Sequence, residues 1–296
     1  SKVFIYLNIG VFLLFALFLF LNSASGNIPG KLKIDVPQTV DIGQGFWVQG
    51  HAPAGFNELY VRWLGQEICL PLEDKEDQLS FCFLLGTDVK MQGPGKKELE
   101  LRARNKNGLS IEVIKEIYVK SKAYPEQRLT VPESKVSLSS KVLARHKREK
   151  KAVNKALNTV SAKRMWLDEF KRPAKGDISS VYGLKRFFND QPRSPHRGVD
   201  FRTGMAAPIR ASNAGRVILC GEHFFAGKSI YIDHGLGLVS MYFHLSEILV
   251  QENQVVQRGQ IIGKSGKTGR VTGPHLHFGL STFGELINPL PILNKD

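Results

Sequence analysis

The stretch GPHLHFGL, residues 273–280, places two histidines two positions apart in an otherwise apolar run. In a β-strand, side chains at positions i and i+2 point to the same face of the sheet. His275 and His277 are therefore expected to face one spot from a single strand. Two imidazoles that converge in this way indicate a metal site, a proton-transfer site, or both. Taken alone, such a pair is more often two surface histidines, so the rest of the chain has to decide.

Two other segments of the second half carry residues that can join this pair. SPHRGVDF, residues 194–201, has His196 and Asp200 four positions apart, on one face of a strand or a helix. SMYFHLSEI, residues 240–248, has His244 at the end of an apolar strand. With one more imidazole, His196 and Asp200 form a set of two nitrogens and one carboxylate oxygen. This set leaves a fourth tetrahedral position for water, as catalytic zinc requires, and the remaining histidines can take the proton of that water.

The first residues predict export. Lys2 precedes an apolar run, Val3 to Leu21, that only Asn8 and Gly10 interrupt. The run has the size of a secretory signal core and is also long enough to span a bilayer as an uncleaved anchor. Residues 1–27 are therefore expected to be a signal peptide or a membrane anchor, and the remainder is expected in the periplasm or cell envelope.

The charge of the chain is strongly positive and unevenly spread. The formal net charge is +14, and much of it falls between Lys135 and Lys175. Such a stretch can meet nucleic acid, anionic lipid or an acidic polymer such as cell wall. No aromatic residue interleaves its densest part, Arg145 to Lys155, so nucleic-acid binding is not indicated. His146, among these charges, is expected to be solvated.

Residues 28–120 are predicted to form a small β-sandwich of immunoglobulin type. About seven short β-rich runs, separated by turn signals such as GPGKK and NKNG, support this assignment. Cys69 and Cys82 are expected in neighbouring strands, either as a disulfide or as a buried, unpaired couple, with Cys220 left over. His51 stands alone and is expected to be structural or on the surface.

Residues 121–175 are predicted to link the two halves. An extended segment containing Pro125 and Pro132 leads into a basic helix, which is expected over 139–170 with a serine cap and to end at Pro173. Trp166 and Phe170, four residues apart, are expected to dock one face of this helix on the following domain.

Residues 176–296 are predicted to be a second β domain rich in glycine. Two of its segments, APIRASNAGRVILCG and ENQVVQRGQIIGKSG, each combine a strand, a tight glycine turn and another short strand. This pattern is also typical of biotinyl and lipoyl carrier modules, which offers a non-enzymatic alternative. Neither segment shows the exposed lysine at a hairpin tip that a carrier needs, and export would separate a carrier from its ligases.

Taken in order, the motifs of this second half resemble the catalytic domain of lysostaphin-like, LytM-type zinc endopeptidases. The resemblance covers Gly176 to Pro289 and includes H-x-x-x-D, the histidine of YFHLS, and H-x-H. It implies an antiparallel β peptidase domain with one Zn²⁺ per chain. It also implies that His196, Asp200 and His277 bind the metal, that His275 is the general base, and that His244 orients or stabilises the reacting oxygen.

The resemblance further implies the substrate and one alternative function. The chain resembles the exported members of the family from Gram-negative bacteria, which have a β-sandwich ahead of the peptidase. This resemblance implies that a zinc-bound water attacks the D-amino-acid cross-links between peptidoglycan peptide stems. Relatives with a broken site act as wall-binding regulators of a partner amidase, which is the alternative here. His223 and His234 do not match the family's site. His234 is expected in a turn, and His223 in a loop where a surface role is favoured over substrate contact.

Overall fold

The computed structural model describes residues 30–72, 78–130, 139–167 and 169–294, which are mostly β-strand. The predicted mainly β class is therefore confirmed. The predicted signal peptide or anchor, residues 1–27, lies outside the described residues. In the part of the chain that the structure describes, no helix combines the length and the apolar character needed to cross a membrane.

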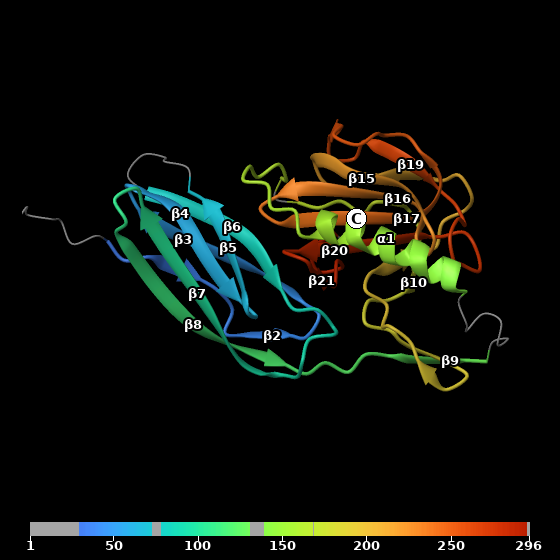
Figure 1. Ribbon diagram of the computed structural model, residues 1–296, viewed down its shortest axis with the longest axis horizontal. Helices are drawn as coiled ribbons and strands as arrows, with labels where there is room; N and C mark the ends of the chain where they lie inside the picture. Colours follow the sequence, from blue (N-terminus) through green and yellow to red (C-terminus); the bar gives the residue numbers. More distant parts are fainter. Residues whose placement is uncertain (1–29, 73–77, 131–138, 168, 295–296) are drawn as a thin grey trace, which may run out of the picture. The chain divides into compact units, whose positions relative to one another are not determined.

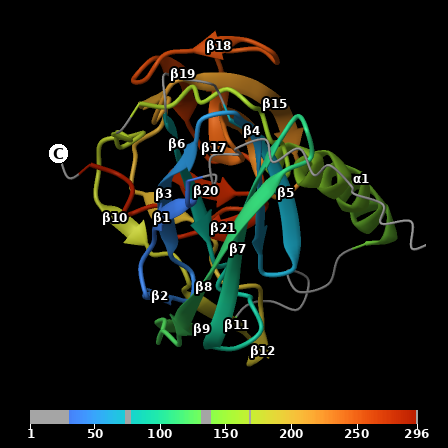
Figure 2. The ribbon, with the colours of Figure 1, turned by 90° about the vertical axis from the view of Figure 1, so that its left-hand side faces the viewer.

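Residues 31–120 form two sheets. One has the strand order β1-β3-β6, with β1 (Lys33–Asp35), β3 (Gly45–Pro53) and β6 (Gln78–Gly86). The other has the order β2-β8-β7-β4-β5, with β2 (Thr39–Asp41), β8 (Ser110–Lys120), β7 (Gly95–Asn105), β4 (Phe56–Trp63) and β5 (Gln66–Pro71). Figure 2 shows the long strands of both sheets side by side.

The core between these sheets follows from strict alternation along the strands. In β7, Leu99, Leu101 and Ala103 are fully buried in a cluster to which both sheets contribute, while Glu98 and Glu100 face the other way. Each of the β-rich runs seen in the sequence lies in one of these strands. The immunoglobulin type of this part stays a prediction, as do the domain boundaries at 28–120, 121–175 and 176–296.

The expectation for Cys69 and Cys82 is wrong in both of its forms. Cys69 is exposed on β5 and Cys82 is half-buried on β6, and no disulfide joins them. The physical reason is the topology, because β5 and β6 follow one another along the chain but belong to different sheets.

The basic helix is shorter than the sequence predicts. Helix α1 (Ser140–Leu157) begins after Ser139, whose side chain accepts a hydrogen bond from the Val142 amide, and it ends at Asn158. The backbone N–H and the side-chain amide of Asn158 both donate to the carbonyl of Asn154, at 3.1 and 2.7 Å, and so close the last turn of the helix. The residues that follow, Thr159 and Val160, are β-branched and favour the helix weakly.

Trp166 and Phe170 therefore lie outside the helix, contrary to expectation, yet both are buried in the core of the second half. Their docking on this core is as expected. Phe170 forms a parallel β-bridge with Leu293, and the Trp166 ring lies 5.1 Å from that of Trp47. The two aromatic residues, four positions apart, thus fix a non-helical segment to the core at two places.

The extended segment ahead of the helix becomes part of a sheet. Strand β9 (Glu126–Leu129) pairs in parallel with β11 (Lys185–Phe188), and β11 also pairs with β12 (Gln191–Pro192). Figure 2 shows these three strands together. The predicted linker is thus hydrogen-bonded to the segment that leads into His196.

A ten-stranded sheet dominates residues 176–296. Its main path is β10-β13-β20-β17-β16-β15-β18, while β14 pairs with β19, β19 also pairs with β17, and β21 pairs with β20. Figure 1 shows β15, β16 and β17 as neighbouring strands. The strand bounds are β10 (Ile178–Ser180), β13 (Val199–Phe201), β14 (Pro208–Arg210), β15 (Gly215–His223), β16 (Gly227–Gly235), β17 (Leu238–Ile248), β18 (Val255–Val256), β19 (Ile261–Ser265), β20 (Leu276–Thr282) and β21 (Glu285–Ile287).

The two similar sequence segments interlock in this sheet. The first strand of the earlier segment, β14, pairs with the second strand of the later one, β19, and β15 pairs with β18 in the same crossed manner. Neither segment therefore forms a self-contained hairpin that presents a tip, as a carrier module would.

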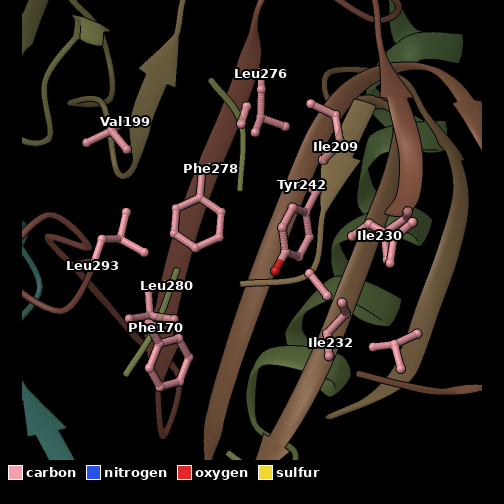
Figure 3. Close-up of a cluster of buried hydrophobic side chains, with 14 of the residues drawn as sticks. Phe170, Val199, Ile209, Ile230, Ile232, Tyr242, Leu276, Phe278, Leu280 and Leu293 are labelled. Atoms are coloured by element: carbon pink, nitrogen blue, oxygen red, sulfur yellow. The ribbon is translucent and has the colours of Figure 1, made fainter. Parts of the chain in front are cut away.

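The core of the second half lies on one face of β20. Leu276, Phe278 and Leu280 alternate along this strand and pack with Tyr242 of β17 and other buried side chains (Figure 3). Because alternate side chains point to opposite faces, His277 lies on the other face of the same strand. Packing of the apolar residues therefore fixes the direction in which the histidine points.

His234 is a core residue, which corrects the expectation of a turn. It lies in β16 and is fully buried, with Nδ1 2.7 Å from the carbonyl oxygen of Ala214 and Nε2 2.7 Å from the hydroxyl of Ser240. The turn comes just after it, where Leu236 and Gly237 have positive φ. Burial lowers the pKa of His234 from 6.5 to about 4.

This buried imidazole predicts a loss of stability in acid. The imidazole of His234 takes up a proton near pH 6.5 in the unfolded chain but only near pH 4 in the folded chain. Its contribution to the free energy of unfolding is therefore complete above pH 6.5 and declines as the pH falls toward 4. The full shift corresponds to about 3 kcal/mol in the free energy of unfolding. Replacement by glutamine (His234→Gln) should remove this part of the pH dependence in denaturant titrations between pH 7 and pH 4. His51→Gln, at an exposed position, should leave the dependence unchanged, and equal slopes for all three proteins would contradict the assignment.

Candidate metal centre

The register of the central strands brings Asp200 and His277 together. Strand β20 lies between β13 and β17, and Asp200 of β13 is directly opposite His277 of β20. On the other side, His277 is opposite Phe243 of β17, whose ring stacks on the imidazole at a centroid distance of 5.2 Å. Directly opposite residues have β-carbons about 4.5–5.5 Å apart, so the carboxylate and the imidazole meet without any loop movement.

His196 reaches the same point from the segment before β13. Its amide donates to the carbonyl of Leu184 at 3.0 Å, and its own carbonyl accepts from the amide of Gly183 at 2.7 Å. Gly198 makes the approach possible, because a β-carbon there would lie 2.6 Å from the His277 ring and 2.5 Å from the Phe278 carbonyl oxygen. A larger residue at this position would displace His277.

Three donor atoms converge at this point. His196 Nε2, Asp200 Oδ1 and His277 Nδ1 are each 2.9 Å from the other two, and all three residues are largely buried. They form the one such group of three histidine, cysteine or acidic residues found in the described part of the chain. The structure thus unites three of the five residues singled out in the sequence.

The tautomer of His196 fits metal binding. Its Nδ1 lies 2.9 Å from the carbonyl oxygen of Val181, which can only accept a hydrogen bond. Nδ1 therefore carries the proton, and Nε2 directs its lone pair at the cluster. A metal-ligating histidine typically donates its other ring N–H in this way.

The protonation states of Asp200 and His277 also fit metal binding. Burial alone would raise the pKa of the Asp200 carboxyl, but the His196 and His277 imidazoles outweigh it and hold that pKa well below its usual range. Burial also lowers the pKa of His277 despite the adjacent carboxylate. Ligand atoms on one tetrahedral zinc lie about 3.3 Å apart, given bonds of about 2.0–2.1 Å, so separations of 2.9 Å need only a small widening.

His275 and His244 stand beside this group without joining it. His275 Nδ1 donates to the Gly273 carbonyl at 3.0 Å, and its Nε2 lies 3.9 Å from Asp200 Oδ1. His244 Nδ1 donates to the Thr268 carbonyl at 3.0 Å, and its ring centroid lies 4.8 Å from that of His275. In the neutral form both therefore present an unprotonated Nε2, which can accept a proton or a hydrogen bond.

The backbone of His244 is strained. Its φ is +66°, in the left-handed region that residues other than glycine rarely occupy, and it interrupts the regular pairing of β16 with β17. Strain of this kind costs about 1–3 kcal/mol and occurs most often at functional sites. Burial, followed by the nearby His277 and His275, lowers the pKa of His244 to about 3, so it is neutral at neutral pH.

Sequence reasoning missed several residues around the site. Arg186 of β11 has a guanidinium nitrogen 3.1 Å from the Ser180 hydroxyl and 3.8 Å from Asp200 Oδ2. Val181 and Thr268 contribute through their backbone carbonyls, which accept hydrogen bonds from His196 and His244. No side-chain pattern in the sequence indicates such contacts. Only Arg186 had a signal, as a charged residue in a short β-rich run just before the SPHRGVDF motif.

Two further histidines, His223 and His146, lie elsewhere and differ from expectation, since His223 is in a strand and not in a loop. His223 ends β15 and is half-buried, with Nδ1 2.7 Å from the Ser229 hydroxyl. His146 is not simply solvated, because its ring meets that of Phe225 edge-on at 4.7 Å. Neither belongs to the group of three donor atoms.

Two imidazoles and one carboxylate around a point, with two further imidazoles beside them, are typical of mononuclear metallohydrolases. The sequence profile of peptidase family M23 matches residues 194–289, which contain all five of these residues. The chain therefore carries a peptidase M23 domain, and the resemblance to LytM-type enzymes is confirmed.

Curated relatives and one solved structure agree with this family. The chain is 42% identical over 118 residues to the peptidoglycan DD-endopeptidase ShyA of Vibrio cholerae, across 40% of this chain and 27% of the relative. It is 46% identical over 84 residues to ShyB of the same organism, across 28% of this chain and 20% of the relative. The chain thus matches about a quarter of the length of these curated relatives. A Pseudomonas aeruginosa crystal structure assigned to peptidase M23 is similar over 83% of this chain and 92% of its own, with 28% identity and a TM-score of 0.57.

Proposed function

We propose that this chain is a zinc-dependent endopeptidase that hydrolyses peptide cross-links of bacterial peptidoglycan. The observation that carries the proposal is the convergence of His196 Nε2, Asp200 Oδ1 and His277 Nδ1, each 2.9 Å from the others. The M23 match and the relatives named peptidoglycan DD-endopeptidase support the reaction and the substrate class.

In this proposal each residue has a definite task. His196, Asp200 and His277 hold the zinc, which when bound lowers the pKa of a water molecule and polarises a carbonyl oxygen. His275 accepts a proton at its free Nε2 and returns it to the leaving amine. His244 is neutral and has its proton on Nδ1, so its Nε2 accepts a hydrogen bond and orients a water rather than donating to an oxyanion.

The proposed substrate also agrees with the charge of the chain. Peptidoglycan stems carry carboxylates, and a chain of net charge +14 attracts such a polymer. We place the protein in the periplasm or cell envelope, either after signal cleavage or held by an N-terminal anchor. The similarity to DD-endopeptidases favours D-amino-acid cross-links over pentaglycine bridges.

The alternative function is a wall-binding regulator that acts through a partner amidase. Such a regulator does not need the donor set, the two flanking imidazoles or the strained His244. All of these are present together here. The intact cluster therefore favours hydrolysis.

The proposal is tested on a defined muropeptide dimer with one cross-link. The zinc-loaded full chain should convert it to two monomeric stems, as seen by mass spectrometry, and a pentaglycine-bridged dimer serves as the comparison. If neither dimer is cut but the chain stimulates an amidase on intact wall, the regulator function replaces the proposal.

The basic helix gives a further prediction on the approach to the wall. In the described residues, Lys147, Arg148, Lys150 and Lys151 form no ion pair, and all are exposed on α1. Reversing these four charges to glutamate should slow release from intact sacculi by about 10-fold through loss of steering. Hydrolysis of a short soluble dimer should change little, and the difference should shrink in high salt because screening acts over about 8 Å at physiological ionic strength.

A matched variant separates steering from net charge. Lys31, Lys33, Lys106 and Lys115 are exposed on the first half of the chain, and reversing them changes the net charge equally. If both sets of reversals slow the sacculus reaction to the same extent, the helix has no special role.

A further inference from the structure

Helix α1 has a contact with the catalytic domain that its basic character does not explain. Glu149 is its single acidic residue, and the side chain is 16% exposed. One carboxylate oxygen accepts from the Phe224 amide at 2.9 Å, and the other accepts from Arg145 Nε at 2.6 Å. Glu149 thus faces the sheet and binds the turn between β15 and β16, while Arg145 holds the carboxylate in place.

A second contact fixes the same turn. The His146 ring meets the Phe225 ring edge-on at 4.7 Å, next to the Glu149 contact. From the other side, the Arg270 amide donates to the Phe225 carbonyl at 3.1 Å, and the Arg270 guanidinium lies over the Phe225 ring at 4.6 Å. The turn formed by residues 224–226 is therefore held between α1 and the 267–270 loop.

This turn supports the strained backbone of His244. The His244 amide donates to the Ala226 carbonyl at 2.9 Å, at the residue whose φ is +66°. The 267–270 loop supplies the other support, since the Thr268 carbonyl accepts from His244 Nδ1 at 3.0 Å. Both hydrogen bonds that fix His244 thus come from segments packed around Phe225.

We propose that Glu149 is a positioning residue, which holds the 224–226 turn so that His244 keeps its left-handed backbone and its orientation toward the metal centre. The effect on catalysis rests on the proposed function, in which His244 orients the reacting water. The effect on the His244 backbone does not depend on it. Helix α1 is then a part of the active-site framework as well as a basic surface.

Amide hydrogen exchange and kinetics on the full chain test this inference. Glu149→Ala should speed exchange at the His244 amide by about 5- to 10-fold, as expected for the loss of one supporting hydrogen bond. It should lower kcat by a similar factor while KM and zinc content stay within about twofold. Glu149→Gln should fall between the wild type and the alanine variant, because its amide oxygen still accepts from the Phe224 N–H while its NH2 group can no longer accept from Arg145. Asn154→Ala, at an exposed and uncharged position of the same helix, is the matched control.

Three results would overturn the inference. One is unchanged exchange at His244 in Glu149→Ala. Another is faster exchange throughout the sheet, which would mean that Glu149 only stabilises the fold. The third is a glutamine variant as defective as the alanine variant. If the wild-type chain cleaves no muropeptide, the proposed function fails, while exchange at His244 still decides the role of Glu149.

Discussion

The His277→Ala chain should lose both its zinc and its hydrolytic activity. His277 Nδ1 is one of three donor atoms 2.9 Å apart, and the β20 register places it directly opposite Asp200. With one donor removed, the two that remain cannot fill a catalytic zinc site, which takes three protein ligands. Metal analysis after dialysis should find less than about a tenth of an equivalent of zinc, with muropeptide hydrolysis at background. His196→Ala and Asp200→Ala should behave in the same way.

His51→Ala is the matched control, because it removes an exposed imidazole far from the cluster along the chain. It should keep a full equivalent of zinc and full activity. Retention of zinc by His277→Ala together with its loss from His275→Ala would reverse the assignment of the two histidines.

The His275→Ala chain should instead keep its zinc and lose most of its turnover. His275 Nε2 is 3.9 Å from Asp200 Oδ1, and its Nδ1 is held by the Gly273 carbonyl, so it stands beside the donor set and not within it. General acid–base catalysis typically contributes about 10²–10⁴-fold, and kcat should fall by that factor. His244→Ala should also keep zinc, and its kcat should fall. The measurement is kcat on a muropeptide dimer at matched zinc content.

Full activity in all five single variants, at His196, Asp200, His244, His275 and His277, would show that the catalytic site lies elsewhere. A fall in kcat without loss of zinc only at His275 and His244 would support the division of roles.

The sequence predicted the strands and the residues of the cluster, but not what holds them. Alternation in GPHLHFGL assigns His277 and Phe278 to opposite faces, and the structure has them so. The supporting hydrogen bonds come from the backbone carbonyls of Val181, Thr268 and Gly273. Every residue has such a carbonyl, so no side-chain pattern could indicate which ones face the site.

The predictions that were wrong concern features set by contacts between segments that lie far apart along the chain. The sequence predicts a helix that continues past Leu157, because most residues up to Phe170 are good helix formers. Burial of Trp166 and Phe170 in the core of the second half instead favours an extended path. The glycines that follow His234 predict a turn at this residue, but its side chain lies in the core. Pairing of β9 with β11 joins residues about sixty apart along the chain, which periodicity within a single segment cannot indicate.

The most direct test of the central claim is a zinc titration of the chelator-treated chain against a cross-linked muropeptide dimer. We predict no hydrolysis without metal and a rate that rises linearly and levels off at about one zinc per chain, whereas His277→Ala stays inactive throughout. Undiminished hydrolysis by the metal-free chain, or restoration of His277→Ala by one equivalent of zinc, would contradict it.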